Sequence, residues 1–364
     1  MIETLSSWSN LLLYIAMAVY SIAFIAFSMD LAGRSARAAE RTERQSAVGA
    51  TAARRNALVG AAAGSAGAST YDTAAREREM AEPASYTTED PSSSVSLAST
   101  RTESGDAWRD TRATPSLRIA MWLTVAAFLV HLAATVLRGI AADRVPWSNM
   151  FEYSMTSTLL IVLVFLLARF WADVRFLGTF ITGFTVITLG IATLGFYVDV
   201  VPLAPALQSV WLVIHVFVAS LATGCLAIGA GLSVAQLLQT RRVARVRAGL
   251  PSRLKLLSAL PDAVRLENLA YRINIVGFIL WTFTLMAGAV WAERAWGRYW
   301  GWDTKEVWTF IIWVVYAGYI HARATRGWRG SPSAWLAIAG FATVMFNFGV
   351  VNVFFKGLHA YSGL

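Results

Sequence analysis

Apolar runs long enough to cross a lipid bilayer recur along the whole chain, and they constrain its fold more than any other feature. The runs lie at 8–29, 117–138, 153–171, 177–197, 208–238, 273–291, 307–322 and 333–355. A transmembrane helix needs about 20 largely apolar residues to cross a hydrocarbon core of ~30 Å. The run at 307–322 is short and needs its aromatic ends to reach both interfaces. The chain is 56% hydrophobic and only 15% charged, which is typical of integral membrane proteins. We therefore predict an all-α polytopic membrane protein with about eight transmembrane helices.

The segment between the first two runs has a different composition. Residues 33–115 are rich in Ala, Ser, Thr, Gly, Arg and Glu and show no sustained hydrophobic period, which favours disorder. The sequence therefore predicts a first transmembrane helix within 1–32, a disordered cytoplasmic linker over 33–115, and a seven-helix membrane domain over 116–364. The first run lacks a small-residue cleavage site, so we expect it to be retained as a helix.

Basic residues follow the first, fifth and seventh apolar runs and predict the orientation. They are Arg34, Arg37, Arg41, Arg44, Arg241, Arg242, Arg245, Arg247, Arg253, Lys255, Arg323, Arg326 and Arg329. The positive-inside rule assigns these loops to the cytoplasm. With eight crossings, both termini and the segments 139–152, 198–207 and 291–306 are then extracytoplasmic. The net charge of +9 reflects this topology, and no nucleic-acid partner is expected. The single cysteine, Cys225, excludes a disulfide framework, a CxxC redox pair and a Cys-rich metal site.

One outer segment, WGRYWGWDTKEVW at 296–308, has an unusual density of tryptophan. Broad indole faces and small glycines admit a flat ligand, and basic side chains can pair with its carboxylates. The residues predicted to bind such a ligand are Trp296, Trp300, Trp302, Arg298 and Lys305. The alternative is an interfacial anchor of aromatic residues. In that reading Asp303 is an N-cap and Glu306 its capping-box partner, and together they open a helix at Thr304.

The chain has four histidines, and the predicted topology divides them into two pairs. His131 and His321 lie inside predicted helices, whereas His215 and His359 lie at the outer side with the tryptophan segment. Paired imidazoles commonly hold haem iron; the alternative is that each histidine hydrogen-bonds a neighbouring helix. The depths of His131 and His321 differ by on the order of 10 Å when helices rise 1.5 Å per residue across a ~30 Å core, so the inner pair is the weaker prediction.

At these residues the sequence resembles the system II cytochrome c biogenesis proteins of the CcsA/CcsB/ResC family, within the haem-handling proteins that carry a tryptophan-rich "WWD" motif. The resemblance rests on WGRYWGWDTKEVW, WVVYAGYIHAR (313–323), VPWSNMFEYS (145–154), SVWLVIHV (209–216) and GLHAYSGL (357–364). It covers 117–364 and the first helix, and excludes the linker. The motif usually has proline where this chain has Thr304, and proline at the first helical position is favourable but replaceable.

The resemblance implies a role for each matching residue. His215 and His359 would ligate the iron of haem b, bound as a substrate, at the outer face, and His131 with His321 would form an intramembrane haem site. Trp296, Trp300, Trp302 and Asp303 match the motif and would form the haem platform. Pro146, Asn149 and Glu152 match a second outer motif of less definite role.

The resemblance also implies a reaction and its partners. Haem would pass to the outer site, where the two thiols of a CxxCH segment in apocytochrome c add across its vinyl groups to form thioethers. The expected partners are a ResB/Ccs1-type membrane protein, apocytochrome c and an upstream thiol reductant system. The expected location is the bacterial cytoplasmic membrane, with the active face extracytoplasmic. Together with its partner, the protein would act as a holocytochrome c synthase.

Other classes of membrane protein stay open. A b-type cytochrome-like electron carrier also uses histidine pairs, although it often places two on one helix, and no predicted helix here carries two. A haem transporter without ligation activity is a further alternative, but transporters favour broken helices and midplane acids, which are scarce in this sequence. A structural scaffold would bind no haem.

Overall fold

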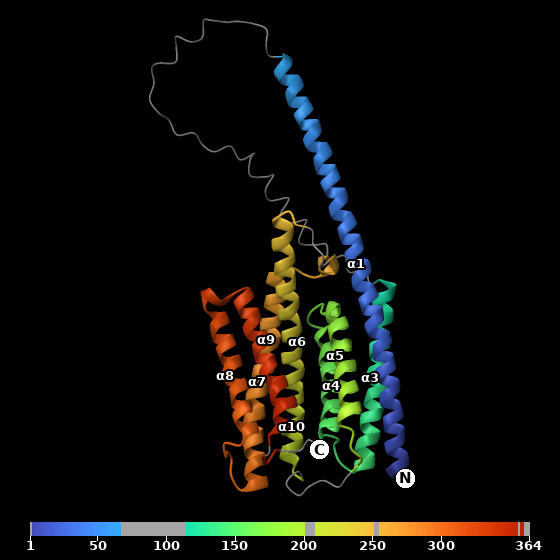
Figure 1. Ribbon diagram of the computed structural model, residues 1–364, viewed down its shortest axis with the longest axis vertical. Coiled ribbons are helices and arrows are strands. Elements are labelled where there is room, and N and C mark those ends of the chain that lie inside the picture. The colour runs from blue at the N-terminus through green and yellow to red at the C-terminus, as the bar shows by residue number, and fades with distance from the viewer. Residues whose placement is uncertain (1, 67–113, 201–207, 251–254, 356, 360–364) are drawn as a thin grey trace, which may run out of the picture.

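The computed structural model describes residues 2–66, 114–200, 208–250, 255–355 and 357–359. Every regular element within these residues is helical, and the long helices run side by side as a bundle (Figure 1). They are α1 (Ile2–Ala66), α3 (Pro115–Ala142), α4 (Met150–Ala168), α5 (Gly178–Gly195), α6 (Val210–Arg247), α7 (Ala263–Trp296), α8 (Thr304–Ala324) and α9 (Ser331–Met345). The last helix continues through a π-helical turn, η6 (Phe346–Val351), into α10 (Asn352–Phe354). Short 3₁₀ turns occur at η2 (Arg175–Leu177), η4 (Lys255–Ala259) and η5 (Arg326–Trp328). The all-α prediction is confirmed.

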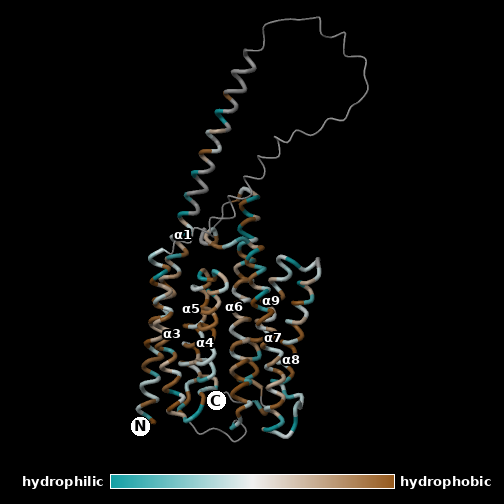
Figure 2. The backbone as a smooth tube through the Cα atoms, turned by 180° about the vertical axis from the view of Figure 1, so that it is seen from behind, coloured by the Kyte–Doolittle hydropathy of each residue, from teal (hydrophilic) through white to brown (hydrophobic). Residues whose placement is uncertain are grey.

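Seven helical segments of the described chain are long and apolar enough to cross a membrane, and Figure 2 shows hydrophobic residues along the length of the bundle. This confirms a multi-pass membrane protein. The predicted crossing at 307–322 corresponds to α8, which has 21 residues and spans about 31 Å. It is not among the seven, since Lys305 and Glu306 lie in its first turn and His321 and Arg323 in its last. The total of eight crossings therefore stays a prediction.

The predicted boundary between the first helix and the linker, at residue 33, lies too near the N-terminus. The first helix does not end near residue 32 but continues to Ala66, projecting well beyond the bundle (Figure 1). The residues from 34 to 66 are rich in Ala and Arg, which have high helix propensity, so the absence of a hydrophobic period did not imply the absence of a helix. The remainder of the predicted linker, 67–113, lies outside the described residues.

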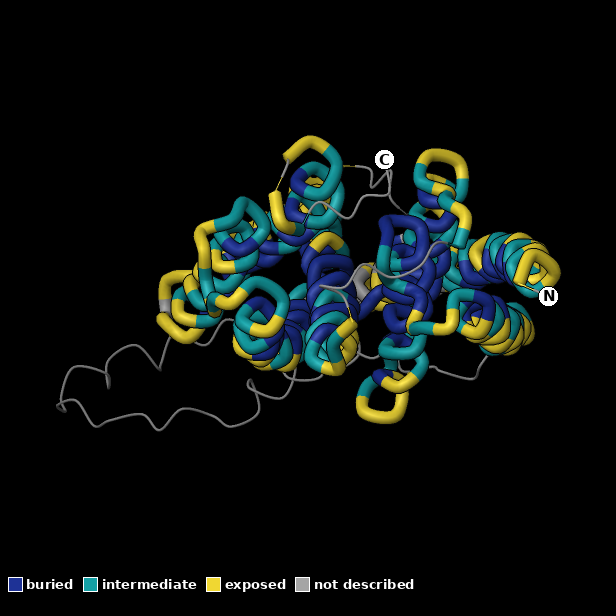
Figure 3. The backbone as a smooth tube through the Cα atoms, turned by 90° about the horizontal axis from the view of Figure 1, so that it is seen from below, coloured by how far each residue is buried: buried dark blue, intermediate teal, exposed yellow. Residues whose placement is uncertain are grey.

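The bundle consists of two groups of helices joined at its centre. Helices α1, α3, α4 and α5 form one group, and α6, α7, α8 and α9 form the other (Figure 1). The most extensive packing is of α1 on α3 and of α6 on α7, while α4 connects the groups through α6. Viewed along the bundle, the buried residues concentrate between the groups and the exposed ones at the periphery (Figure 3). Side chains on α4 and α6 are buried over most of their length, because these helices have neighbours on several sides.

Side-chain contacts bring the predicted outer segments to one end of the bundle. Arg138 at the end of α3 reaches Ser6 of α1 and the carbonyl oxygen of Val198 beyond α5. At the same end, the Asn352 amide contacts Met150 of α4, and the Lys305 ammonium donates to Asn352. The starts of α1, α4 and α8 and the ends of α3, α5 and α10 therefore share one end. That this end is extracytoplasmic stays a prediction from the basic loops.

A buried ionic cluster connects α3 and α4 at this end. Glu152 is fully buried and accepts from the Arg138 Nε at 3.2 Å and from the Arg144 Nη1 at 2.6 Å. It also accepts from the backbone N–H and the hydroxyl of Ser148. Arg138, with no exposed side-chain surface, lies over the Phe151 and Tyr197 rings. One carboxylate thus compensates two arginines, and the chain between α3 and α4 folds around it.

We predict that Glu152→Ala destabilises the protein by about 3–5 kcal/mol, because removing one member of a buried ion pair leaves charge uncompensated. The matched control is Asp173→Ala, which removes the partner of Arg175 in a partly exposed pair and should cost at most ~1 kcal/mol. Thermal denaturation of the detergent-solubilised variants, followed by circular dichroism, measures both. If the two variants lost equal stability, Glu152 would not be a main stabilising residue of the fold.

Candidate functional site

A cavity of about 220 Å³ opens between the two helix groups, toward the end of the bundle at which α4 and α8 start and which is predicted to be the outer one. Helices α4 and α5 contribute one wall, and α6, α7, α8 and the α9–α10 segment contribute the other. Among the side chains lining it are His215, Trp291, Trp300, Lys305, Asn347 and His359. The structure therefore brings the predicted outer histidine pair together with part of the tryptophan segment.

His215 lies on the second turn of α6, whose start is capped by the Ser209 side chain. Its Nδ1 lies 2.9 Å from the carbonyl oxygen of Thr284 on α7. The ring stacks on Trp291 with 6.0 Å between centroids and 18° between planes. Gly288 makes this close approach possible, because a Cβ at that position would lie 2.7 Å from the His215 Cε1. The imidazole is thus wedged against α7 in a defined orientation.

His359 follows the last helix and contacts the start of α8. Its Nδ1 lies 2.7 Å from the Asp303 Oδ2, and its ring meets the edges of Trp291 and Trp296 at centroid distances of 5.5 and 4.8 Å. Burial lowers the pKa of His359, although the Asp303 carboxylate acts in the opposite direction. Gly357 lets the chain pass close to Asp303, since a Cβ there would overlap the Asp303 carboxylate. The histidine is therefore held neutral and oriented by a carboxylate.

These two contacts fix the tautomers of both rings. A carbonyl oxygen and a carboxylate only accept hydrogen bonds, so the proton of each neutral imidazole is on Nδ1. Each Nε2 then carries a lone pair, and neither Nε2 has a hydrogen-bond partner among the described residues. A neutral imidazole with one nitrogen oriented by a backbone carbonyl or a carboxylate is the usual form of a metal-ligating histidine. The site offers two such groups beside one cavity.

The tryptophans of the outer segment occupy different positions. Trp296 packs on His359 and Trp291, and Trp300 lines the cavity. Trp302 is 74% exposed, has φ of +61° and contacts Trp300 edge to face. It therefore lies on the rim rather than in the wall. A left-handed backbone at a bulky residue is strained, and here it immediately precedes the start of α8.

Glu306 organises the loop that carries these tryptophans. One of its carboxylate oxygens accepts from the backbone N–H groups of Gly301 and Asp303 at 2.8 and 3.0 Å, and Asp303 completes a capping box at the start of α8. Gly297 ends α7 in the left-handed conformation, with φ of +70°, as glycine readily does. The capping role predicted for Asp303 is confirmed, and the same carboxylate also holds His359.

The two cations predicted to pair with a ligand differ in their surroundings. Arg298 is 34% exposed and pairs with Glu306 at 3.4 Å, so it braces the loop rather than lining the cavity. The Lys305 ammonium faces the α9–α10 segment and donates to the carbonyl oxygen of Asn347 at 2.9 Å and to the Asn352 Oδ1 at 2.5 Å. Lys305 lines the cavity without a direct carboxylate partner among the described residues.

The second outer motif forms part of the same wall. Trp147, Ser148 and Asn149 line the cavity, and the Asn149 side chain caps α4 by accepting from the Glu152 N–H. The Pro146 carbonyl oxygen accepts from the Thr156 hydroxyl at 2.7 Å. Together with the Glu152 cluster, these contacts hold the segment before α4 against the cavity. The role of this motif is thus to fold a wall of the site.

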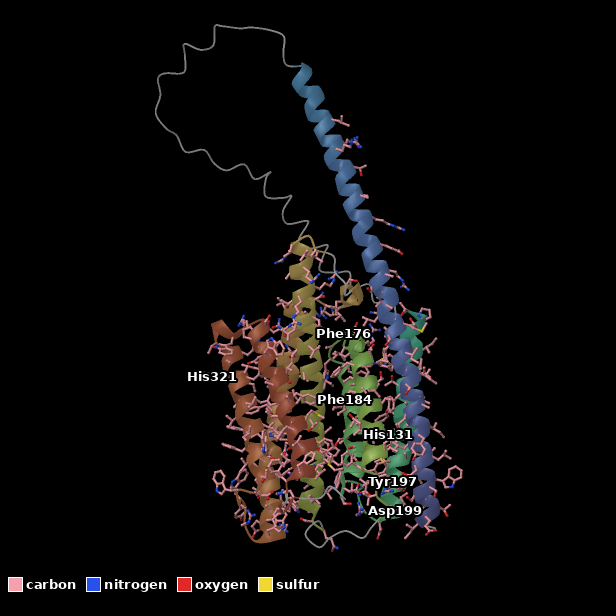
Figure 4. All side chains as sticks on the ribbon, viewed as in Figure 1. His131, Phe176, Phe184, Tyr197, Asp199 and His321 are labelled. Atoms are coloured by element: carbon pink, nitrogen blue, oxygen red, sulfur yellow. The ribbon has the colours of Figure 1, made fainter. Side chains whose placement is uncertain are left out.

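The structure does not bring His131 and His321 together, so this predicted pair is wrong for the chain as described. His131 is fully buried on α3, next to Tyr20 of α1, whereas His321 is exposed on α8. Figure 4 shows the two on opposite flanks of the bundle. The buried face of α8 carries Tyr316, Tyr319 and Arg323, and His321 lies on another face. Sequence depth alone could not give the rotational position of either helix.

Several residues of the cavity were not singled out from the sequence. Thr284, Gly288 and Trp291 all face His215 from α7. Their spacing of i, i+4 and i+7 places them on one helix face. Sorting the residues of the 273–291 run by helix face would therefore have identified the three as neighbours. Asn347 lies in the π-helical turn. The regular α-helical period is interrupted there, so a helix-face analysis could not have identified this residue.

The chain is similar to proteins of cytochrome c biogenesis. Residues 147–359, more than half of the chain, match the family model of the cytochrome C assembly protein. The chain is 35% identical over 269 residues to the cytochrome c biogenesis protein CcsA of Synechococcus sp. (strain RCC307), covering 67% of this chain and 85% of that protein. It is 34% identical over 266 residues to CcsA of Microcystis aeruginosa, covering 62% and 81%.

A solved structure, titled cytochrome c heme lyase CcmF, aligns with a TM-score of 0.49 at 20% identity over 78% of this chain and 52% of its own. The matched family region begins at Trp147 in the second outer motif and ends at His359, so it encloses the cavity residues described above. The chain belongs to the cytochrome C assembly protein family.

Proposed function

We propose that this protein is the haem-handling subunit of a cytochrome c synthase, and that it holds haem b as a substrate in the outer cavity for attachment to apocytochrome c. The observation that carries the proposal is the convergence of His215 and His359 on one aromatic cavity, each with Nδ1 hydrogen-bonded and Nε2 without a partner among the described residues. Bis-imidazole ligation needs two such nitrogens. The relatives named as CcsA support the same conclusion.

The chemistry of the walls fits a flat, anionic macrocycle. Trp291, Trp296 and Trp300 supply aromatic faces beside the histidines, and the Lys305 ammonium supplies a positive charge for a carboxylate. The Asn347 Oδ1 is buried without a hydrogen-bond partner among the described residues. Small-molecule pockets usually measure about 300–1,000 Å³, so a cavity of about 220 Å³ has to widen to admit a porphyrin. Tyr299 and Trp300 of the loop 297–303 line this cavity.

The residues of this chain position the reactants, and the bond-forming chemistry belongs to the haem vinyl groups and the thiols of the apocytochrome. His215 and His359 would hold the haem iron, and ligation by both would limit oxygen chemistry at the iron. The tryptophans would cover the haem and exclude water. Asp303 keeps the His359 proton on Nδ1, so that Nε2 stays a ligand. The absence of CxxC from this sequence agrees with a separate protein reducing the substrate thiols.

His131 and His321 both lie outside the cavity. His131 is fully buried on α3 beside Tyr20 of α1, and neither of its ring nitrogens has a hydrogen-bond partner among the described residues. His321 is exposed on α8, so any role as an iron ligand requires a second ligand from another molecule. A ResB/Ccs1-type membrane protein packed on that face fits this requirement. The outer cavity is then extracytoplasmic in the bacterial cytoplasmic membrane, as the basic loops predict.

The second candidate function is a b-type electron carrier, which also needs two axial histidines. A carrier retains its haem while the iron cycles between oxidation states, whereas a delivery protein releases haem to an apocytochrome. Incubating the haem-loaded protein and its partner with a CxxCH peptide separates the two: transfer of the Soret absorbance to the peptide supports delivery. Haem that stays on the protein after the thiols are reduced and the partner is present supports the carrier.

We predict that His215→Gly and His359→Gly each lose the Soret band of the purified protein and recover part of it with added imidazole, which fills the space left by the side chain. His321→Gly is the matched control, because the same substitution at an exposed histidine outside the cavity should leave the spectrum of the purified protein unchanged. Absorption spectra of the detergent-solubilised variants measure this. If the cavity variants kept the wild-type spectrum, the ligand assignment would be wrong.

We also predict that Gly288→Ala displaces the His215 ring, because the new Cβ would lie 2.7 Å from its Cε1. The variant should fold, since alanine favours a helix by about 1 kcal/mol over glycine, but its haem affinity should fall. Gly318→Ala on α8 is the control, because no atom lies within 4 Å of a Cβ there. Haem titration of both variants checks the expectation, which fails if their affinities are equal.

A third prediction separates the two roles of Asp303. Serine is a good N-cap residue, so Asp303→Ser should keep the start of α8 but lose the contact with His359. Asp303→Asn keeps both the cap and an acceptor oxygen while removing the charge. A carboxylate partner makes a ligating histidine a stronger donor, so the haem reduction potential should rise in both variants, and more of the bound haem should be five-coordinate in Asp303→Ser. Redox titration and resonance Raman spectra measure these effects; unchanged values would limit Asp303 to capping.

A further inference from the structure

A second crevice, of about 590 Å³, lies at the end of the bundle opposite the histidine cavity. Its walls come from the first turns of α3 and from the end of α4 with the turn η2 that follows. The residues that matter here are Arg118, Trp122, Arg169, Phe170, Asp173 and Arg175. None of them belongs to the proposed haem site.

The charges in this crevice do not balance. Asp173 is engaged by Arg175 through two hydrogen bonds of 2.7 and 2.8 Å. Asp30 of α1, whose charge also acts on Arg175, pairs with Arg34 at 2.9 Å and accepts from Thr114 and Ser116. Arg118 and Arg169 are exposed, and neither pairs with a carboxylate within the described chain. Arg169 lies over the Phe170 ring at 5.7 Å from its centroid. Both guanidinium groups thus border the crevice without a carboxylate partner among the described residues.

The rest of the crevice is apolar and aromatic. Leu117, Met121, Val125 and Leu166 line it. Trp122 and Phe170 are 73% and 75% exposed, far more than a packed interior would leave them. Exposed aromatic side chains near the ends of transmembrane helices mark the depth of the lipid headgroups. The arginines thus lie at the level of the lipid headgroups, and the apolar wall lies on the side of the membrane core. Together they form an amphipathic binding surface.

We propose that this crevice binds an anionic phospholipid, with its phosphate between Arg118 and Arg169 and an acyl chain along Trp122 and Val125. A lipid-facing crevice in a bilayer is filled by lipid, and basic pockets between helices on the cytoplasmic side select anionic headgroups. Guanidinium groups bind phosphate oxygens in a bidentate manner. Free phosphate is also anionic, but it has no apolar group to pack against the apolar wall. A phospholipid can contact both the arginines and the apolar residues of the crevice. The site is independent of the proposed haem function.

The test uses the intact chain in nanodiscs of phosphatidylcholine, titrated with fluorescent phosphatidylglycerol. The Arg118→Gln/Arg169→Gln variant should bind phosphatidylglycerol roughly 25-fold more weakly, from ~1 kcal/mol for each basic residue near the membrane surface. Both arginines are exposed, so folding should survive, and circular dichroism checks it. The matched control is Arg241→Gln/Arg247→Gln, which removes two exposed arginines from the end of α6 and should leave the affinity unchanged. Equal affinities in the two double variants would overturn the site.

A further variant and a competitor separate lipid from simple anion binding. Val125→Trp fills the apolar half of the crevice without changing its charge, and it should weaken phosphatidylglycerol binding severalfold. Inorganic phosphate at the same concentration should not displace the lipid. If Val125→Trp bound phosphatidylglycerol like the wild type, or if inorganic phosphate competed equally, the crevice would be an anion site and the lipid assignment would be wrong.

Discussion

The arrangement of the outer site depends on how α8 begins. The first backbone N–H groups of a helix have no partner within the helix, and in this chain the side chains of Asp303 and Glu306 supply reciprocal caps. Glu306 reaches past the cap to the N–H of Gly301 and so folds the tryptophan loop back onto the helix. Asp303 reaches in the other direction, to His359. One local requirement, the satisfaction of a helix terminus, thereby positions an aromatic rim and a histidine that follows it by 56 residues.

The buried ionic cluster around Glu152 plays the corresponding role on the facing wall. Charges are retained in a low-dielectric interior when they are compensated and hydrogen-bonded, and Glu152 meets that condition for Arg138 and Arg144. The cluster holds the segment from Pro146 to Asn149 in place, so Trp147 and Asn149 line the cavity. The two walls therefore rest on separate polar anchors, one in each group of helices. The two walls on either side of a bound ligand are therefore held by separate sets of residues.

Much of this could be predicted from the sequence, because it follows from hydropathy and local signals. The lengths of the apolar runs predict the helices, and the Asp303 and Glu306 spacing predicts the start of α8. Gathering His215, His359 and the tryptophans on one side needs only the topology and the positive-inside rule. The failures have a different origin. Whether His131 and His321 face each other depends on the rotation of helices in different groups, and periodicity does not fix that rotation when most faces are apolar. The helix after residue 33 was missed because it has helix-forming residues, while its described side chains beyond Ser35 are exposed and so need no apolar period.

The π-helical turn between α9 and α10 has a consequence for how this segment can vary. A π-bulge accommodates one additional residue within an otherwise continuous helix, and each residue corresponds to about 100° of rotation. The side chains after Val351 are therefore out of phase with those before Phe346, and Asn352 is turned toward Lys305. The carbonyl of Asn347, lying in this turn, accepts from the same ammonium. Losing one residue here would leave a regular helix of nearly the same length, yet it would turn the C-terminal segment, with its histidine, away from its present direction. The turn therefore sets the direction in which the side chains of α10 point.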